Sequence, residues 1–369
     1  MEEEQPEFIQ FTPNVFSRIA PDIYLERNLK EGIRPNLRKY EEFRSVQVND
    51  KGFGRYDESN PTKSSVLGSS VVKVGKTTVI CAITGGIVSD DDILNQATTF
   101  SNPFATVYPL VEIARGRSGA CTDEEMILAQ KLYETLKSSG IIRKSALKIK
   151  YGYKGRTSDE KVEVIFPHNG PQPDGADNDD NDEVMTDGNT AETIPFQDKQ
   201  YSFVLYANLQ VFSRTGPPFD ICWTALIKAL KNTKLPYTFL DEDSTVSKTV
   251  KSRSGANATI ERSQLICDPV LNYPIKLEEH KIGYSSTFGL VTIPDGEKSQ
   301  EILLADIEGE SEESASTSLV HVVVAGDKLT SLTIHGGSKA GGNGSRITKD
   351  FIKKSIDLAH QRSLHLSSI

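Results

Sequence analysis

Short segments rich in β-branched residues recur along this chain and predict β-strands. Residues 66–74 read VLGSSVVKV and residues 77–84 read TTVICAIT, with only Gly75 and Lys76 between them. Two such runs joined by a two-residue turn that contains glycine indicate an antiparallel hairpin. The same pattern predicts strands from Val107 onward and at 146–153, 161–166, 201–213, 264–267, 282–293, 301–307, 319–325 and 328–334.

Other stretches repeat apolar residues at helical spacing. Behind Thr122 and Glu125, which are spaced as a capping box, apolar residues recur every four positions, so a helix is expected there. Asp220 is the expected N-cap of a second helix. The apolar face consists of Leu128, Leu132 and Leu136 in the first helix and of Trp223, Leu226, Ile227 and Leu230 in the second. A short helix expected at 21–32 has an apolar face of Leu25 and Leu29, and a helix near the C-terminus has one of Phe351, Ile352, Ile356 and Ala359.

Strand-rich segments punctuated by single helices predict an α+β protein of two related halves of mixed β-sheet with packed helices. We expect an N-terminal extension at 1–37, a first domain at 38–245 and a second domain at 246–369. A disordered acidic insert is expected at about 170–197, and an acidic loop at about 308–317.

The charge is unevenly distributed. The chain has a net charge of −9, but residues 174–192 and 308–314 are strongly acidic, and we expect both stretches to be solvated loops. Without them the body is close to neutral, so basic patches that bind nucleic acid remain possible.

The cysteines and the apolar runs limit the class of protein. Cys81, Cys121, Cys222 and Cys267 lie far apart with no metal-ligand spacing, which favours buried free thiols over a metal site. No metal or cofactor is therefore expected. No apolar run approaches the roughly 18 residues of a membrane span, and the start MEEEQPEF lacks the features of a signal peptide, so we expect a cytosolic or nuclear protein.

Three segments could bind an anion. VGKTT at 74–78 resembles the end of a P-loop, but Ser70 stands where that motif needs glycine and a strand follows, which favours a hairpin turn. The R-x-R turn, residues 115–119, precedes a helix, and Arg115 and Arg117 could hold phosphate or lie in a solvated turn. HGGSKAGGNGSR at 335–346 contains Lys339 and Arg346, but a mobile surface loop is favoured there.

The segment 214–220 has the local architecture of an anion site without its chemistry. A strand leads through Gly216 into a helix, but the helix begins with Phe219 and Asp220 rather than with a hydroxyl residue or arginine. The Asp220 carboxylate is expected to cap the helix amides itself and to repel phosphate.

Several of these motifs together resemble the ribonuclease PH family. They are GSSVVKVGKTTVICAI, the R-x-R turn before a capped helix, the unit ending in ALIKALKN, and IRPNLRKYEEFR, in which Asn36 and Leu37 replace the Asp-Gly of the family's R-P-D-G-R. The resemblance covers about residues 30–360 and implies the ribonuclease PH fold. Within the family, the chain looks like a subunit of the eukaryotic exosome core ring.

The resemblance also implies a degenerate active site. Active members read approximately D-G-G-T-R-T/S in the turn, so their phosphate-binding arginine and hydroxyl residue correspond to Phe219 and Asp220, behind Gly216. Their catalytic aspartate corresponds to His280, or, with a shift of one or two residues, to Glu278 or Glu279. Loss of the phosphate site alone would prevent phosphorolysis.

The function implied is that of a non-catalytic exosome ring subunit, which supports 3'-to-5' RNA processing and degradation, including ribosomal RNA maturation, by ring assembly and RNA channelling. Its implied partners are ribonuclease PH-like subunits in a six-membered ring, cap proteins, a separate nuclease and RNA at Arg115 and Arg117, but no membrane. The implied location is the nucleus, nucleolus and cytoplasm. Two alternatives stay open: an active phosphate-dependent exoribonuclease that uses Glu278 or Glu279 with Arg214, and an assembly module without RNA contact.

Overall fold

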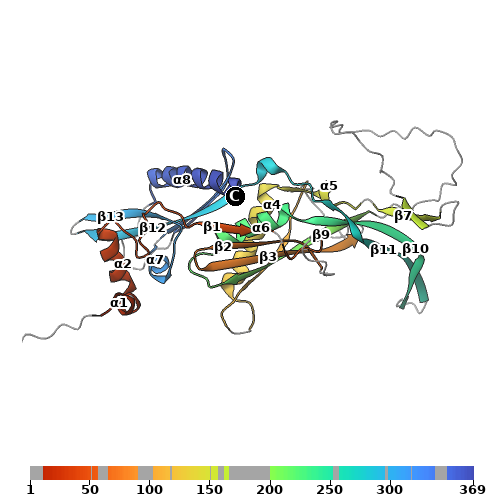
Figure 1. The fold of residues 1–369 in the computed structure, drawn as a ribbon, viewed down its shortest axis with the longest axis horizontal. Helices are drawn as coiled ribbons and strands as arrows, with labels where there is room; N and C mark the ends of the chain where they lie inside the picture. The colour runs from red at the N-terminus through yellow and green to blue at the C-terminus, as the bar shows by residue number, and fades with distance from the viewer. Residues whose placement is uncertain are drawn as a thin grey trace, which may run out of the picture.

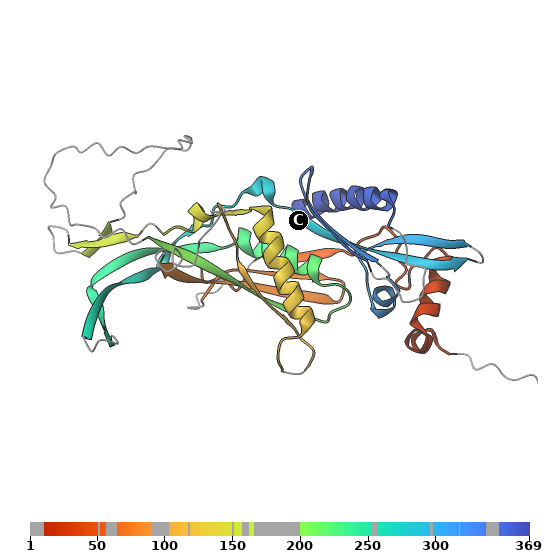
Figure 2. The same cartoon turned by 180° about the vertical axis from the view of Figure 1, so that it is seen from behind.

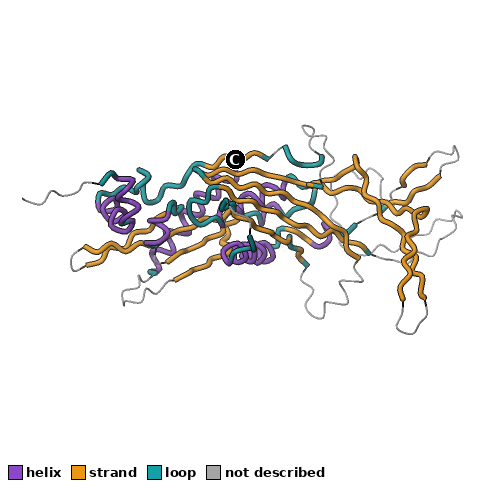
Figure 3. Tube along the Cα trace, turned by 90° about the horizontal axis from the view of Figure 1, so that it is seen from below, coloured by secondary structure: helices purple, strands orange, loops and turns teal. Residues whose placement is uncertain are grey.

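The molecule is elongated, with a helix-covered sheet at one end, a central sheet in the middle and a long β-arm at the other end (Figure 1). The computed structural model describes residues 11–50, 52–56, 65–89, 103–116, 119–149, 151–156, 162–165, 200–251, 257–295, 298–316, 318–336 and 347–369. The described strands run mostly along the long axis (Figure 3). The predicted α+β class is confirmed.

The central sheet is mixed and has the strand order β1-β2-β3-β9-β5. Its strands are β1 (Val46–Asn49), β2 (Val66–Val74), β3 (Thr77–Ser89), β9 (Tyr201–Phe212) and β5 (Tyr108–Ile113). The predicted hairpin is confirmed, because β2 and β3 pair antiparallel with Val74 opposite Thr77, and Gly75 takes a positive φ of 59° in the turn. VGKTT therefore forms a hairpin turn and not a phosphate-binding loop.

Two helices pack against this sheet. The capping box predicted α4 (Asp123–Ser139) correctly, and this helix crosses the back of the molecule beside β5 (Figure 2). The second helix, α6 (Phe219–Lys231), is buried on all sides because it lies between β2 and β3 of the central sheet and β12 of the second half. The indole Nε1 of Trp223 donates to the carbonyl of Gly283 at 2.8 Å, so α6 binds the two halves together.

The β-arm extends from the central sheet. It has the order β11-β10-β7-β8, formed by β10 (Lys234–Lys251), β11 (Asn257–Pro274), β7 (Gly152–Arg156) and β8 (Val162–Ile165). The domain boundary predicted between residues 245 and 246 falls inside β10, so the chain passes to the second sheet later than predicted. The strand predicted at 146–153 begins instead as the short helix α5 (Lys144–Leu147).

The second half is an antiparallel sheet with the order β13-β12-β14-β15. Its elements are β12 (Tyr284–Asp295), β13 (Lys298–Ala305), β14 (Ser318–Ala325), β15 (Lys328–Gly336), α7 (Glu310–Ala315) and the C-terminal helix α8 (Lys349–Ser368). Ala359 of α8 is fully buried against a core that includes Phe288 and Val322.

The N-terminal extension packs on the second half. It contains α1 (Pro13–Ile19), which was not predicted, and the predicted α2 (Pro21–Lys30). Leu25 and Leu29, 1% and 2% exposed, join a cluster with Val291 and Leu304 of β12 and β13. Because the four-residue spacing places both leucines on one face, the helix has a single apolar stripe to bury.

The cysteines differ partly from the expectation. Cys81 and Cys222 are buried free thiols, and burial raises the pKa of both, whereas Cys121 is exposed and Cys267 is intermediate. Within the described ranges, no group of three or more His, Cys, Asp or Glu side chains could hold a metal ion. No helix in the described part of the chain is long and apolar enough to cross a membrane.

Candidate nucleic-acid site

The segment 214–220 is pressed against the second half of the molecule. Gly216 has a φ of 137°, and a Cβ there would lie 2.4 Å from the carbonyl oxygen of Ile307. The amide of Gly309 donates to the carbonyl of Thr215 at 3.1 Å. Only glycine fits this backbone and this contact, so Gly216 fixes how the segment meets the second half.

The role predicted for Asp220 as an N-cap is wrong. The helix α6 begins at Phe219 with Pro218 at the cap position, and no side-chain cap hydrogen bond is present. The Asp220 carboxylate instead accepts a hydrogen bond from Ser285 Oγ of β12 at 2.5 Å. Burial raises the pKa of Asp220, against the opposing effect of hydrogen bonds from Ser285 and Thr287.

Phe219 fills the position that the family resemblance assigns to a phosphate-binding arginine. Its ring is 3% exposed and stacks on Trp223, with ring centroids 6.3 Å apart. The ring of His321 meets it edge-on at 5.9 Å, and Lys131 Nζ lies 4.4 Å from its centroid. The space is thus closed by an aromatic ring and its neighbours.

Burial reduces the basicity of the side chains around Phe219, so that at neutral pH Lys131 keeps its charge but His321 does not. Desolvation by burial lowers the pKa of Lys131 to about 8, and desolvation with the nearby charge of Lys131 lowers that of His321 to about 3. His321 is therefore neutral, and its Nδ1 shares a hydrogen bond of 2.7 Å with Thr287 Oγ1. The sequence pattern gave no indication of either residue.

Arg214 is close to the turn but is already paired. Its Nε donates to Glu124 at 2.6 Å, and its two terminal nitrogens donate to Glu313 at 3.1 and 2.5 Å. The bidentate geometry is the one an arginine uses for phosphate. A phosphate ion could take this arginine only by displacing a carboxylate of the protein itself.

A second arginine near the turn is also occupied. Arg44 is 8% exposed and donates through Nε and Nη2 to Asp306 at 2.8 and 2.6 Å, and through Nη1 to Thr215 Oγ1 at 3.1 Å. Hydrogen bonds and charge from Arg44 lower the pKa of Asp306, although its burial acts in the opposite direction. Arg38 joins the same group through Asp306 and Glu308.

The acidic segment 308–317 was predicted to be a solvated loop, which is wrong. Residues 310–315 form α7, and Glu312 is 1% exposed. Its carboxylate accepts hydrogen bonds from Arg34, which is fully buried, and from the amide of Glu308 at 2.8 Å. A buried carboxylate needs such partners, and this arginine lies 278 residues away in sequence. The insert at 170–197 lies outside the described residues.

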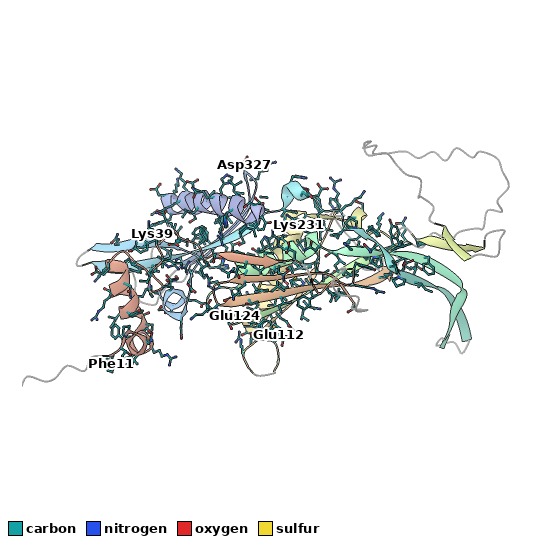
Figure 4. The ribbon with its side chains drawn as sticks, viewed as in Figure 1. Phe11, Lys39, Glu112, Glu124, Lys231 and Asp327 are labelled. Atoms are coloured by element: carbon teal, nitrogen blue, oxygen red, sulfur yellow. The ribbon has the colours of Figure 1, made fainter. Side chains whose placement is uncertain are left out.

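The R-x-R turn lies at the base of α4, beside the labelled residues Glu112 and Glu124 (Figure 4). Arg115 donates to Glu124 at 2.7 Å, and both side chains are about one-third exposed. The carboxylate of Glu125 accepts from the amides of Thr122 and Ile113 at 2.6 and 2.8 Å, and these hydrogen bonds lower its pKa. The first turn of α4 is thus strongly acidic, and Arg117 lies outside the described residues.

His280 does not reach the segment 214–220. It lies in the 3-10 turn Glu279–Lys281, is 68% exposed at its side chain, and faces Glu278 at 3.5 Å. The amide of Glu278 donates to the carbonyl of Ile141, beyond the C-terminal end of α4, and its carboxylate pairs with Arg143. The residues of the second half that contact the turn instead include Ser285, Ile307 and Gly309. His335 and Gly336 end β15, and the rest of the glycine-rich segment, with Lys339 and Arg346, lies outside the described residues.

Comparison with known proteins identifies the family. The model of the 3' exoribonuclease family, domain 1 (RNase PH), matches residues 42–236, which is more than half of the chain. The chain belongs to this family. The resemblance to the ribonuclease PH family, inferred from its motifs, is confirmed.

One relative and two solved structures extend the comparison. The chain is 24% identical over 356 residues to the exosome complex component rrp43 of Schizosaccharomyces pombe, covering 96% of both proteins. The motifs RPNLRKYEEFR, RGRSGACTDEEM and SRTGPPFD also resemble the fungal ribosomal RNA-processing protein 43. The fold is similar to the Archaeoglobus fulgidus exosome with RNA bound to the active site (TM-score 0.55, 14% identity) and to an archaeal exosome core (0.52, 13%), each match covering 96% of this chain and 98% of the other.

Proposed function

We propose that this chain is a non-catalytic subunit of an RNA exosome core ring. It supports 3'-to-5' RNA processing and degradation, including ribosomal RNA maturation, by assembling the ring and channelling RNA to a separate nuclease. The observation that carries the proposal is the state of the turn 214–220, where Phe219 occupies the arginine position and Arg214 is held by Glu124 and Glu313.

Phosphorolysis needs inorganic phosphate held in line with the scissile bond by cations and hydrogen-bond donors. Here Arg214, at the start of the turn, and Arg44, which contacts Thr215, pair with carboxylates of the chain itself. Displacing Asp306 would leave a largely buried carboxylate without its partner, at a cost of about 3–5 kcal/mol, whereas Glu313 is one-third exposed and its displacement would cost less. Internal carboxylates therefore take the place that the phosphate would need.

An exposed apolar surface supports contact with neighbouring subunits. β5 lies at the edge of the central sheet among the described strands, so one side of its backbone is unpaired within that sheet. On this strand and beside it lie large apolar residues that are about half exposed or more: Tyr108 49%, Leu110 60%, Met126 54%, Ile127 67% and Tyr206 46%. Such a surface is typical of protein–protein contact.

The proposal also specifies the partners of the chain. They are ribonuclease PH-like subunits in a six-membered ring, cap proteins, a separate nuclease, and RNA at Arg115 and Arg117. The proposed locations are the nucleus, nucleolus and cytoplasm, which microscopy of a fluorescently tagged chain would test.

Two measurements test the proposal. The purified chain and the reconstituted complex are incubated with labelled RNA with and without inorganic phosphate, and we expect neither to release nucleoside diphosphates through this subunit. Phosphate-dependent release by the purified chain would overturn the non-catalytic assignment. In the complex, Leu110→Glu with Ile127→Glu should abolish stoichiometric co-purification, while Val270→Glu, at a residue 74% exposed on the β-arm, should preserve it.

RNA contact is separable from assembly. Ultraviolet crosslinking of the assembled complex to RNA should weaken at this subunit when Arg115 and Arg117 are changed to glutamate, because phosphate contacts depend on their positive charge. Unchanged crosslinking in an intact complex would remove both arginines from the RNA path and favour the assembly module without RNA contact at this turn.

A further inference from the structure

Exposed or half-exposed cations gather at the end of α4 opposite the R-x-R turn. They come from the C-terminal end of α6, the start of β10, the segment after β11, and β6 (Ile142–Arg143) with α5. We call them the basic band: Lys231, Lys234, Lys276, Lys281, Arg143, Lys144 and Lys148. Figure 2 shows α5 close to the 3-10 turn at the top of the molecule, across α4 from the R-x-R turn, and Figure 4 places Lys231 away from Glu124.

Backbone contacts make the basic band one continuous surface. Lys234 is opposite Pro274 in the β10–β11 ladder, and Ile275 donates to the carbonyl of Thr233 at 3.1 Å, which brings Lys276 beside Lys234. Leu277 forms a β-bridge with Ile142.

Arg143, Lys144 and Lys281 of the basic band lie next to this β-bridge. Arg143 is opposite Phe104 of β4 (Phe104–Ala105), and Lys144 donates its amide to the carbonyl of Pro103 at 2.9 Å. Lys281 Nζ lies 4.2 Å from the centroid of the Phe104 ring.

The positive charge of the band is largely uncompensated. Among the described residues, Arg143 is paired with Glu278, whereas no lysine of the band forms a salt bridge. Glu278, which pairs with Arg143, and Glu279 of the 3-10 turn are carboxylates beside the band. A chain with a net charge of −9 thus concentrates free cations on one surface, and like charges held together are relieved by an anion.

Aromatic rings lie among these cations. Tyr237, three residues after Lys234, meets Tyr273 at a centroid distance of 5.0 Å, and both are half-buried. Phe104 is half-buried under Lys281. These rings contact Lys281, Gly140 and one another, so they set the shape of the surface, and the lysines are the groups that can follow the phosphate backbone of a single-stranded nucleic acid.

We infer that the basic band is a second RNA-contact surface, which binds the phosphate backbone of single-stranded RNA at the end of α4 away from Arg115. The choice of RNA as the ligand rests on the proposed function. The position and chemistry of the surface rest on the contacts of the band itself.

The test is fluorescence anisotropy of a labelled oligouridylate with the full-length chain over a series of salt concentrations. The variant Lys144→Gln/Lys276→Gln/Lys281→Gln should bind roughly tenfold to hundredfold more weakly at about 0.1 M salt, with a salt slope smaller by about 2, because each phosphate contact contributes about 0.7. The control Lys328→Gln/Lys349→Gln/Lys353→Gln carries the same charge change on exposed lysines of β15 and α8 and should keep the wild-type affinity and slope.

Two outcomes would overturn the inference. Equal losses in both triple variants would show an effect of net charge alone. Unchanged RNA affinity in the band variant, with lost binding of labelled polyglutamate, would assign the band to an acidic protein segment. Co-purification of the same variant with the reconstituted complex is measured in parallel, so a failed RNA site in an assembled complex leaves the proposed function standing.

Discussion

Arg34 and Glu312 form a buried ion pair between the N-terminal extension and the second half, with side chains 0% and 1% exposed. Arg34 Nε donates to Glu312 Oε1 at 2.9 Å, and its Nη1 donates to the carbonyl of Ala305 at 2.6 Å. With these hydrogen bonds both charges are satisfied away from water, as buried ions require.

Removal of one partner tests this pair. Arg34→Met should lower the free energy of unfolding by about 3–5 kcal/mol, because Glu312 would remain buried without a counter-charge. Urea denaturation followed by circular dichroism measures it. Lys30→Met, which breaks the exposed pair with Glu26, should change stability by less than about 0.5 kcal/mol, and a similar small effect at Arg34 would contradict the prediction.

Two glycine-to-alanine substitutions, one of them a control, test the contact at the turn. Gly216→Ala should destabilise the fold by about 2 kcal/mol or more, because its Cβ would lie 2.4 Å from the Ile307 carbonyl oxygen in addition to the strained φ. Gly326→Ala, with a positive φ of 55° and open space around it, should cost only about 1–2 kcal/mol. Thermal unfolding of both variants compares them, and equal losses would refute the steric account.

Asp220 should make stability fall as the pH rises. Its folded pKa is raised, so the folded state holds the proton more tightly, and this stabilisation is present below the unfolded pKa of about 4 and is lost as the pH passes the folded pKa. Asp220→Asn should therefore gain stability relative to the wild type between acidic and neutral pH. The urea midpoints of both proteins, measured across that pH range, test this gain. A difference between the two midpoints that stays constant with pH would exclude the titration of Asp220.

Asp306 should make stability rise with pH, which is the opposite of the effect expected for Asp220. Its pKa is lowered by Arg44, so its stabilisation is present above the unfolded pKa of about 4 and is lost as the pH falls through the folded pKa. In Asp306→Asn the fold should be less stable than the wild type at neutral pH, and the difference should shrink in acid. A difference that grows in acid would contradict the assigned role of Arg44.

Lys131 should titrate near pH 8. Burial beside the Phe219 ring lowers its pKa to about 8 from the ordinary value of 10.5. Carbon-13 NMR of reductively methylated protein should resolve one lysine signal with this midpoint, which should move upward in Phe219→Ala as water reaches the amine. A Lys131 midpoint of about 10 or above in the wild type would contradict the desolvation.

Features set by neighbouring residues were predictable from sequence. The capping box of Thr122 and Glu125 predicted α4, and the Gly75 turn predicted the β2–β3 hairpin, because both depend on positions a few residues apart. The presence of Phe219 and Asp220, instead of an arginine and a hydroxyl residue, at the start of α6 could also be read from the sequence.

Features that depend on residues far away in the sequence could not be predicted from the sequence. Asp220 looks like an N-cap locally, but Ser285 lies 65 residues further on. Glu312 looks solvated, but Arg34 makes it a buried residue. The family resemblance predicted His280 at the site, but His280 lies in an exposed 3-10 turn and faces Glu278. Periodicity also could not show that β10 continues past residue 245 into the β-arm.

The packing of α2 has a consequence for biosynthesis. Leu25 and Leu29 leave the ribosome long before their core partners Val291, Ile293, Ile302 and Leu304, which lie more than 250 residues later in the chain. The nascent central sheet can begin to form while α2 still has no place to bury its leucines. We therefore expect α2 to need protection from aggregation during translation until β12 and β13 have been released.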